Sequence, residues 1–362
     1  SLSDKFQDAY FKNNPYYYML IQIPLESYLD LVRHEYFGHG ARAREYNIEG
    51  SYEIPFDWPL SVGGKFDSYG WTSKGDEAIL LFTAGMESGT YFAYKYQKYF
   101  LKDPDFAQRH FFYYLFSKGD LVAYTYKANS EFTTTKNIDP ESDIEAYYAA
   151  LDAKYSWKED VIGAYQGTHR LTYQALYSVY DLVLFSAANV WDWSWSILSG
   201  KNDYVAGIPN WKLFGQRFLP GTRVALTPWG VEYYLDMYFL QNDNSVNTFY
   251  IRQSDRYLED FYGAGFELEK IVSAGNFSCG LGLDVFSQPL ENEATTNATY
   301  YVQPSRNKQG HNIYITPAWQ FIDNKDFSFA LITKYAYKTE GYVMGQPLRP
   351  GSYGFLGFEF KY

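Results

Sequence analysis

Phe277–Val285 has the sequence FSCGLGLDV, in which apolar side chains alternate with small or charged ones. A period of two puts successive side chains on opposite faces of a β-strand. The same alternation recurs in Val231–Phe239, Ile313–Phe321 and Phe327–Tyr337. One face of each segment is apolar or aromatic and the other is small, polar or charged. This pattern is typical of barrel strands with lipid outside and a polar lumen inside.

The connections between these segments alternate in length. Short turns are expected at Asn242–Ser245, Ser273–Asn276 and Asp323–Asp326, and longer connections at Ser254–Asp260, Gln288–Gly310 and Thr339–Gly351. Outer-membrane barrels have short periplasmic turns and long extracellular loops. We therefore expect an antiparallel transmembrane β-barrel located in a bacterial outer membrane, with outer-membrane lipid as a partner.

The end of the chain has the same alternation, with apolar or aromatic residues at Leu356, Phe358, Phe360 and Tyr362. This ending resembles the terminal signal of outer-membrane barrel proteins, in which the last residue is aromatic. The resemblance implies that the last strand ends in the periplasm.

The expected barrel has about eight strands. Seven are expected from about Trp229 onward, and Trp211–Leu219, before a turn at Pro220-Gly221, is the candidate for the eighth that an even-stranded barrel needs. Pro228 and Pro317 are expected within strands, where the missing amide N–H costs a ladder hydrogen bond.

The N-terminal half has a helical period instead. After Pro24, apolar residues recur at helical spacing, and further helices are expected at Asp76–Leu101, Pro104–Phe116, Ser142–Leu151 and Leu171–Leu198. Tyr46–Gly70 and Tyr124–Ile138 are expected as connections. The predicted fold class is α+β, with a mainly helical region over residues 1–205 and the barrel over residues 206–362.

Composition narrows the possible functions. The net charge of -11, from 31 basic and 42 acidic residues, argues against a nucleic-acid partner, because phosphate binding needs a basic surface. Aromatic residues make up 21% of the chain, and tyrosine and tryptophan suit membrane interfaces. An aromatic-rich soluble β-protein or a carbohydrate binder has a similar composition. A single cysteine, Cys279, excludes an intrachain disulfide.

One segment carries a pattern associated with chemistry, His34-Glu35-Tyr36-Phe37-Gly38-His39, in a chain with five histidines. Zinc-binding helices usually place two histidines at i and i+4 beside a glutamate that acts as general base. Here the spacing is i and i+5, which puts the histidines about 140° apart on a regular α-helix. A local π-bulge would bring them together, and Gly38 makes an irregular turn easier. The alternative is a buried, hydrogen-bonded His-Glu-His cluster without metal.

The motif resembles the H-E-x-x-G-H zinc motif of the dipeptidyl peptidase III family over about seven residues, including Gly40 after it. The resemblance implies that His34 and His39 bind zinc and that Glu35 is the catalytic base. It also implies a third ligand, a glutamate on a downstream helix. The family's second motif, E-E-x-x-A-E, has no match here.

Glu87 is the candidate for that third ligand. It lies on a predicted helix in the sequence AGMESG, whose small residues would allow a close approach to the motif helix. The alternative role is an interhelical ion pair with Arg42 or Arg44. His169 is a candidate for polarising a substrate carbonyl, although a lone histidine is more often a surface or core residue.

Together these patterns predict an outer-membrane zinc metallopeptidase that hydrolyses a peptide or protein substrate with a zinc-activated water and Glu35 as base. The alternative is a non-enzymatic outer-membrane pore or adhesin whose helical half is a plug or a partner-binding module. A metal-dependent amidase or lipid hydrolase would use the same chemistry.

Overall fold

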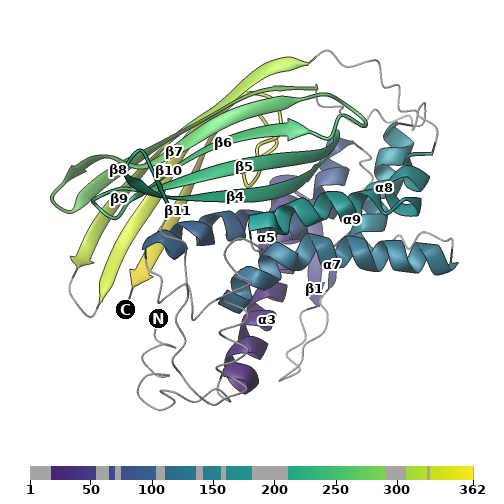
Figure 1. Cartoon of the computed structure of the whole chain (residues 1–362), viewed down its shortest axis with the longest axis horizontal. Coiled ribbons are helices and arrows are strands. Elements are labelled where there is room, and N and C mark those ends of the chain that lie inside the picture. Colours follow the sequence, from purple (N-terminus) through teal and green to yellow (C-terminus); the bar gives the residue numbers. More distant parts are fainter. Residues whose placement is uncertain are drawn as a thin grey trace.

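The chain folds into N-terminal helices followed by one large antiparallel sheet (Figure 1). The computed structural model describes residues 18–53, 65–69, 75–102, 111–135, 142–155, 160–181, 211–289, 307–323 and 327–361. The predicted α+β class is confirmed at this level.

The sheet has nine strands, and each pairs antiparallel with its neighbour in sequence. Their bounds are β3 Lys212–Leu213, β4 Gln216–Thr227, β5 Gly230–Leu240, β6 Val246–Ser254, β7 Tyr262–Ala274, β8 Phe277–Gln288, β9 Lys308–Asp323, β10 Ser328–Lys338 and β11 Gly351–Lys361. β3 has two residues, whereas the other eight strands have nine or more. The order of pairing runs from β3 to β11, and the described residues show no pairing between these two end strands, so the sheet is open there.

The start of the sheet differs from the prediction. Phe214 and Gly215, with φ of 53° and 79°, form the turn that separates β3 from β4. The expected turn at Pro220-Gly221 is wrong, because Pro220 lies inside β4 opposite Met237. Its missing N–H is tolerated because β4 is paired with β3 only at Gln216 and Arg217 in the described part of the chain.

The predicted connections are confirmed where the structure describes them. β5–β6 and β7–β8 are joined by short turns, and β6–β7 and β10–β11 by longer loops. Because the strands are antiparallel, β5, β7 and β9 end at one side of the sheet, called here the short-turn end. β4, β6, β8 and β10 end at the opposite side, called the long-loop end. Residues 324–326 and 290–306 of the predicted connections lie outside the described residues. Pro228 lies in the β4–β5 turn, not within a strand, whereas Pro317 lies in β9 opposite Cys279.

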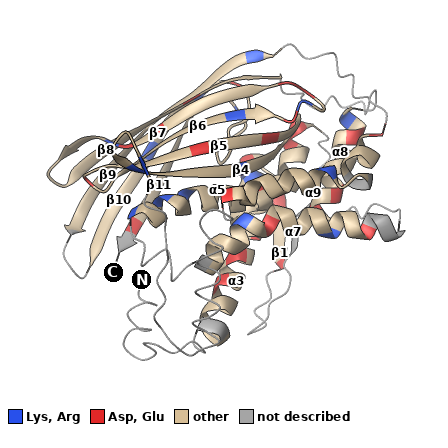
Figure 2. Ribbon diagram, in the orientation of Figure 1, with Lys and Arg blue, Asp and Glu red and all other residues tan. Residues whose placement is uncertain are grey.

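The two faces of the sheet differ as the alternation predicts. One face, called here the outward face, carries exposed apolar side chains that include Ile315 at 42%, Trp319 at 51% and Tyr335 at 61% exposure. The opposite face is called the inner face. The inner face carries buried charged pairs such as Arg252 with Asp284, at 2.5 Å. Figure 2 shows charged residues on the helices and also on strands such as β5 and β6.

The helical region lies below the sheet in Figure 1. Its helices are α3 Ile23–Val32, α4 Gly40–Glu45, α5 Asp76–Lys102, α7 Phe111–Thr135, α8 Asp143–Lys154 and α9 Arg170–Ala175. Short π- and 3-10 segments are η1 Tyr18–Gln22, η2 Arg33–His39, η3 Gly163–Gly167 and η4 Leu176–Val179, and a hairpin is formed by β1 Glu49–Glu53 and β2 Lys65–Tyr69.

Two expected connections contain regular structure. α7 extends to Thr135, so the connection predicted at Tyr124–Ile138 is wrong over most of its length. The hairpin of β1 and β2 lies within the other, Tyr46–Gly70. Residues 104–110 and 182–198 of the predicted helices lie outside the described residues.

α5 is the helix that joins the two halves. Its C-terminal half runs along the inner face of the sheet, where Lys98 and Lys102 pair with Glu267 and Glu269 of β7 at 2.7 and 2.5 Å. Its N-terminal half packs against η2 and α8. Among the helices of the described residues, none combines the length and apolar composition needed to cross a bilayer.

Candidate metal centre

The HEYFGH segment lies in a π-helix, η2, which is the irregularity expected to bring its two histidines together. The N–H of Gly40 donates to the carbonyl of Glu35, five residues earlier, which is the hydrogen bond of a π-turn. The wider turn brings His34 and His39 to the same side, with their Nε2 atoms 3.3 Å apart. The local irregularity therefore creates the juxtaposition that a regular helix would prevent.

Two glycines allow η2 to lie close to α5. A Cβ at Gly38 would lie 2.6 Å from Cα of Gly85, and a Cβ at Gly85 would lie 2.2 Å from Nε2 of His34. These separations are shorter than van der Waals contact, so neither position has room for a side chain. The crossing also allows Nδ1 of His39 to reach the carbonyl of Leu81 at 2.8 Å.

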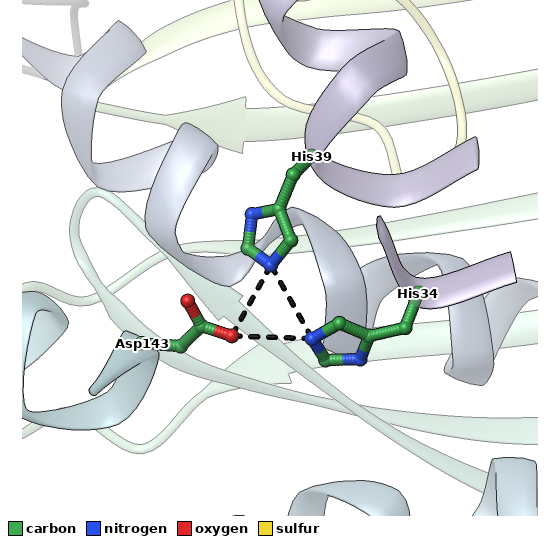
Figure 3. A group of neighbouring side chains, drawn as sticks. All are labelled: His34, His39 and Asp143. Atoms are coloured by element: carbon green, nitrogen blue, oxygen red, sulfur yellow. Dashed lines mark hydrogen bonds and ion pairs between the residues drawn. The ribbon is translucent and has the colours of Figure 1, made fainter. Parts of the chain in front are cut away.

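The third group of the cluster is Asp143, the first residue of α8 (Figure 3). Its Oδ2 lies 3.2 Å from Nε2 of His34 and 3.1 Å from Nε2 of His39. His34, His39 and Asp143 each offer one ligand atom, and these atoms all lie within 4.8 Å of one another. Two imidazole nitrogens and one carboxylate oxygen form a donor set that zinc accepts.

The outer nitrogens of both histidines are held by the protein. His34 Nδ1 lies 3.3 Å from Oδ2 of Asp120, which Arg33 also contacts at 3.2 Å. His39 Nδ1 faces the Leu81 carbonyl, which only accepts, so Nδ1 carries the hydrogen and the Nε2 of the neutral ring keeps its lone pair. Each Nδ1 thus contacts a protein oxygen, and each Nε2 points toward the other histidine and Asp143. Histidines that bind a metal are usually oriented by neighbouring groups in this way.

The surrounding carboxylates favour positive charge at this point. Burial opposes protonation of His34, but Asp120 and Asp143 outweigh it and raise the pKa of His34 to about 10. Burial likewise opposes protonation of His39, and Asp143 raises its pKa above the ordinary value. Burial acts to raise the pKa of Asp143, but the two histidines hold it below its usual range. The cluster is thus compatible with a bound cation or with protonated histidines.

Glu35 is buried, with 5% exposure, beside His34 and His39 in the same turn. Burial raises the pKa of its carboxyl, and the neighbouring His34 and His39 act in the opposite direction. A desolvated carboxylate is a stronger base than one in water, which suits the predicted role.

Tyr124 is a further polar neighbour. Its ring stacks on His34 with centroids 5.1 Å apart, and its hydroxyl lies 3.3 Å from Nε2 of the same histidine. Burial raises the pKa of this phenol well above its ordinary value, so the hydroxyl stays protonated and can donate.

Sequence reasoning did not identify Asp143, Asp120 or Tyr124. Asp143 is 104 residues from His39, and its one signal was its place in the first turn of a predicted helix. Tyr124 lay in a segment expected to be a connection, and Asp120 carried no pattern of its own.

The structure places the other two predicted site residues elsewhere. Glu87 accepts two hydrogen bonds from Arg42 Nη2, at 2.6 and 2.8 Å, and one from the N–H of Gly345, at 2.8 Å. Glu87 thus forms the ion pair given as the alternative, and Asp143 is the carboxylate that lies beside the two histidines. His169 is the N-cap of α9 in the left-handed conformation, and the contacts of the cluster within the described residues do not include it.

Comparison with known proteins adds no relative. No family model matches the chain, and neither the curated proteins nor the solved structures contain a match. The relation to dipeptidyl peptidase III implied by the short motif therefore has no support from these comparisons.

Proposed function

We propose that this chain is an outer-membrane zinc hydrolase whose metal is held by His34, His39 and Asp143. The observation that carries the proposal is the convergence of their ligand atoms, 3.1–3.3 Å from one another, at a place where both Nδ1 atoms are already engaged. The choice of a peptide or protein substrate rests on the resemblance of HEYFGH to a peptidase motif.

The chemistry is divided among groups of the chain. Zinc in such a site would polarise a carbonyl group and supply an activated water. Glu35 would accept the proton of the attacking water, since it is buried next to both ligands and its raised pKa makes it a better base. Asp120, with Arg33, would keep His34 in the ligand orientation.

The membrane part of the proposal rests on the outward face of the sheet. Exposed apolar residues occur there on β6, β8, β9, β10 and β11, while the inner face is polar and buried. A contiguous exposed apolar face of this extent is rare on soluble monomers and suits contact with lipid. In the membrane we expect the sheet to close into a barrel of eight long strands.

Metal analysis tests the zinc site directly. The purified chain should contain about one zinc, and His34→Gln and Asp143→Asn should lose it because each removes one of three protein ligands. Matched controls are His311→Gln, at an exposed position of β9, and Asp152→Asn, on α8 outside the cluster. Glu87→Gln should also keep zinc. A metal-free parent, or equal metal in all variants, contradicts the proposal.

A non-enzymatic barrel remains the second candidate, favoured by one observation. α5 lies along the inner face with its lysines paired to β7, an arrangement suited to a plug. In that case the protonated histidines and Asp143 would be a structural cluster. The same metal analysis separates the two functions.

A further inference from the structure

A hollow of about 960 Å³ opens on the outward side of the sheet, between α9–η4 and strands β5 and β6. It is separate from the metal centre, and the residues of that centre do not line it. Its lining is more apolar than polar, and both the helical segment and the sheet contribute side chains to it.

α9 contributes the polar side chains Arg170 and Gln174 to this lining. Arg170 is the first residue of this helix, and its side chain is 37% exposed. The guanidinium stacks on Tyr257 at 4.4 Å, and Nη2 lies 3.7 Å from Asp255. Its Nε and the Oε1 of Gln174, which also lines the hollow, are both buried and have no hydrogen-bond partner among the described residues. The wall of the hollow thus carries one donor and one acceptor whose hydrogen-bonding capacity is unused.

The ion pair between Arg170 and Asp255 is a long one. The Oδ2 of Asp255 already accepts hydrogen bonds from Gln174 Nε2 at 2.8 Å and from the Tyr165 hydroxyl at 3.3 Å. Arg170 is the most distant of its polar neighbours, at 3.7 Å. The guanidinium can therefore bind a second anionic group without giving up a short ion pair.

β5 and β6 contribute the aliphatic side chains Leu235 and Ile251. Leu235 and Ile251 lie directly opposite each other on β5 and β6 and are 40% and 55% exposed. They continue the outward apolar face that runs across the following strands. On the helical rim, Tyr173 and Tyr180 are 67% and 57% exposed, a placement typical of aromatic residues at a membrane interface.

We propose that the hollow binds a membrane phospholipid with an anionic, hydroxyl-bearing headgroup such as phosphatidylglycerol. The phosphate would bind Arg170, a headgroup hydroxyl would donate to Gln174 Oε1, and one acyl chain would lie along Leu235 and Ile251. The charge of Arg170 and the continuity with the apolar face argue for lipid as the occupant. The inference rests on the membrane placement proposed above and is independent of zinc.

Native mass spectrometry of the detergent-purified chain, with phosphatidylglycerol added at fixed ratios, tests the site. Arg170→Gln and Ile251→Ser should each reduce retained lipid at least fivefold. The matched controls are Arg256→Gln, a 64% exposed arginine paired with Asp260, and Ile313→Ser, 45% exposed on β9. Both controls should retain lipid as the parent does.

Equal retention by all four variants overturns the proposal, as does full displacement by glycerol 3-phosphate, which would indicate a site for a soluble phosphate. Partition of the parent into detergent is measured separately. A parent that partitions but shows equal retention in its variants refutes the lipid site alone, whereas a parent that stays in aqueous buffer refutes the membrane placement too.

Discussion

Glu35 and its two histidine neighbours have different roles, and substitution can separate them. Glu35→Gln removes the basic carboxylate but no ligand, so the variant should keep its zinc. Hydrolysis should fall by roughly 10²–10⁴-fold, the contribution usual for a positioned general base. Zinc content and cleavage of a casein substrate are measured on the same preparation. Loss of zinc, or unchanged hydrolysis, contradicts the assigned role.

Gly85 is a second residue at which a small substitution should change zinc binding. In Gly85→Ala the new Cβ would lie 2.2 Å from His34 Nε2, so the ring must move away from the metal position. We expect loss of zinc and of stability. Gly119→Ala is the control, because a Cβ there has open space within α7, and it should raise stability by up to about 1 kcal/mol. If both variants bind zinc equally, the close crossing is not what positions His34.

Among the site residues, those close together in sequence could be predicted, whereas the one far away in sequence could not. His34, Glu35 and His39 lie in one turn, so their relation follows from backbone geometry alone. Asp143 reaches them only through the packing of α8, and no spacing rule predicts contact across 104 residues. Glu87 lies on a helix with flanking small residues, as expected, but its carboxylate forms an ion pair with Arg42.

Among the elements, those with strong periodicity were the predictable ones. The alternation in β5, β8, β9 and β10 fixes which side chains share a face, and the turns between them follow from the same pattern. The boundaries at Pro220 and Tyr124 were wrong for different reasons. Pro220 is tolerated because β4 lies near the sheet edge. α7 continues past Tyr124 because Thr125, Ala128 and Asn129 are buried, and this packing outweighs the weak helix propensity of Thr125 and Asn129.

The contact of α5 with the sheet depends on Glu267. Its carboxylate contacts Lys95 and Lys98 at 3.0 and 2.7 Å, and it accepts a hydrogen bond from Tyr94 at 3.0 Å. Glu267→Gln leaves buried Lys98 without its countercharge and should cost about 3–5 kcal/mol of unfolding free energy.

The control is Glu340→Gln, which removes an exposed pair with Lys308 and should cost at most about 1 kcal/mol. Thermal unfolding in detergent compares the two variants. Equal melting temperatures would mean that α5 is not held in place by this pair.

For the whole molecule, the helical region is attached to the long-loop end of the sheet. Arg42 donates to the carbonyl of Gln346, and Glu45 accepts from the N–H of Leu348, both in the β10–β11 loop. Lys154 donates to Pro228 in the β4–β5 turn at the same end. With long loops outside the cell, as in known outer-membrane barrels, the metal centre would face the exterior.

Cysteine labelling tests this orientation in a Cys279→Ser background. Lys308→Cys, at the long-loop end, should react with a membrane-impermeant maleimide on intact cells. Asn244→Cys, in the β5–β6 turn, should react only after permeabilisation. The reverse pattern would place the metal centre in the periplasm.

A single charged substitution on the outward face of the sheet tests the membrane placement. Ile315 lies in the middle of β9, opposite Leu281, and its side chain is 42% exposed. If this face contacts hydrocarbon, Ile315→Arg should cost about 2–4 kcal/mol, since a guanidinium near the bilayer midplane loses its hydration.

In water the same change on an exposed position would cost little. Asn242→Arg, at an exposed position of the β5–β6 turn, should be neutral in either setting. Unfolding of both variants is followed in lipid vesicles and in detergent-free buffer. A parent that is stable in buffer, together with an Ile315→Arg variant equal to it in stability, would make the sheet a soluble one.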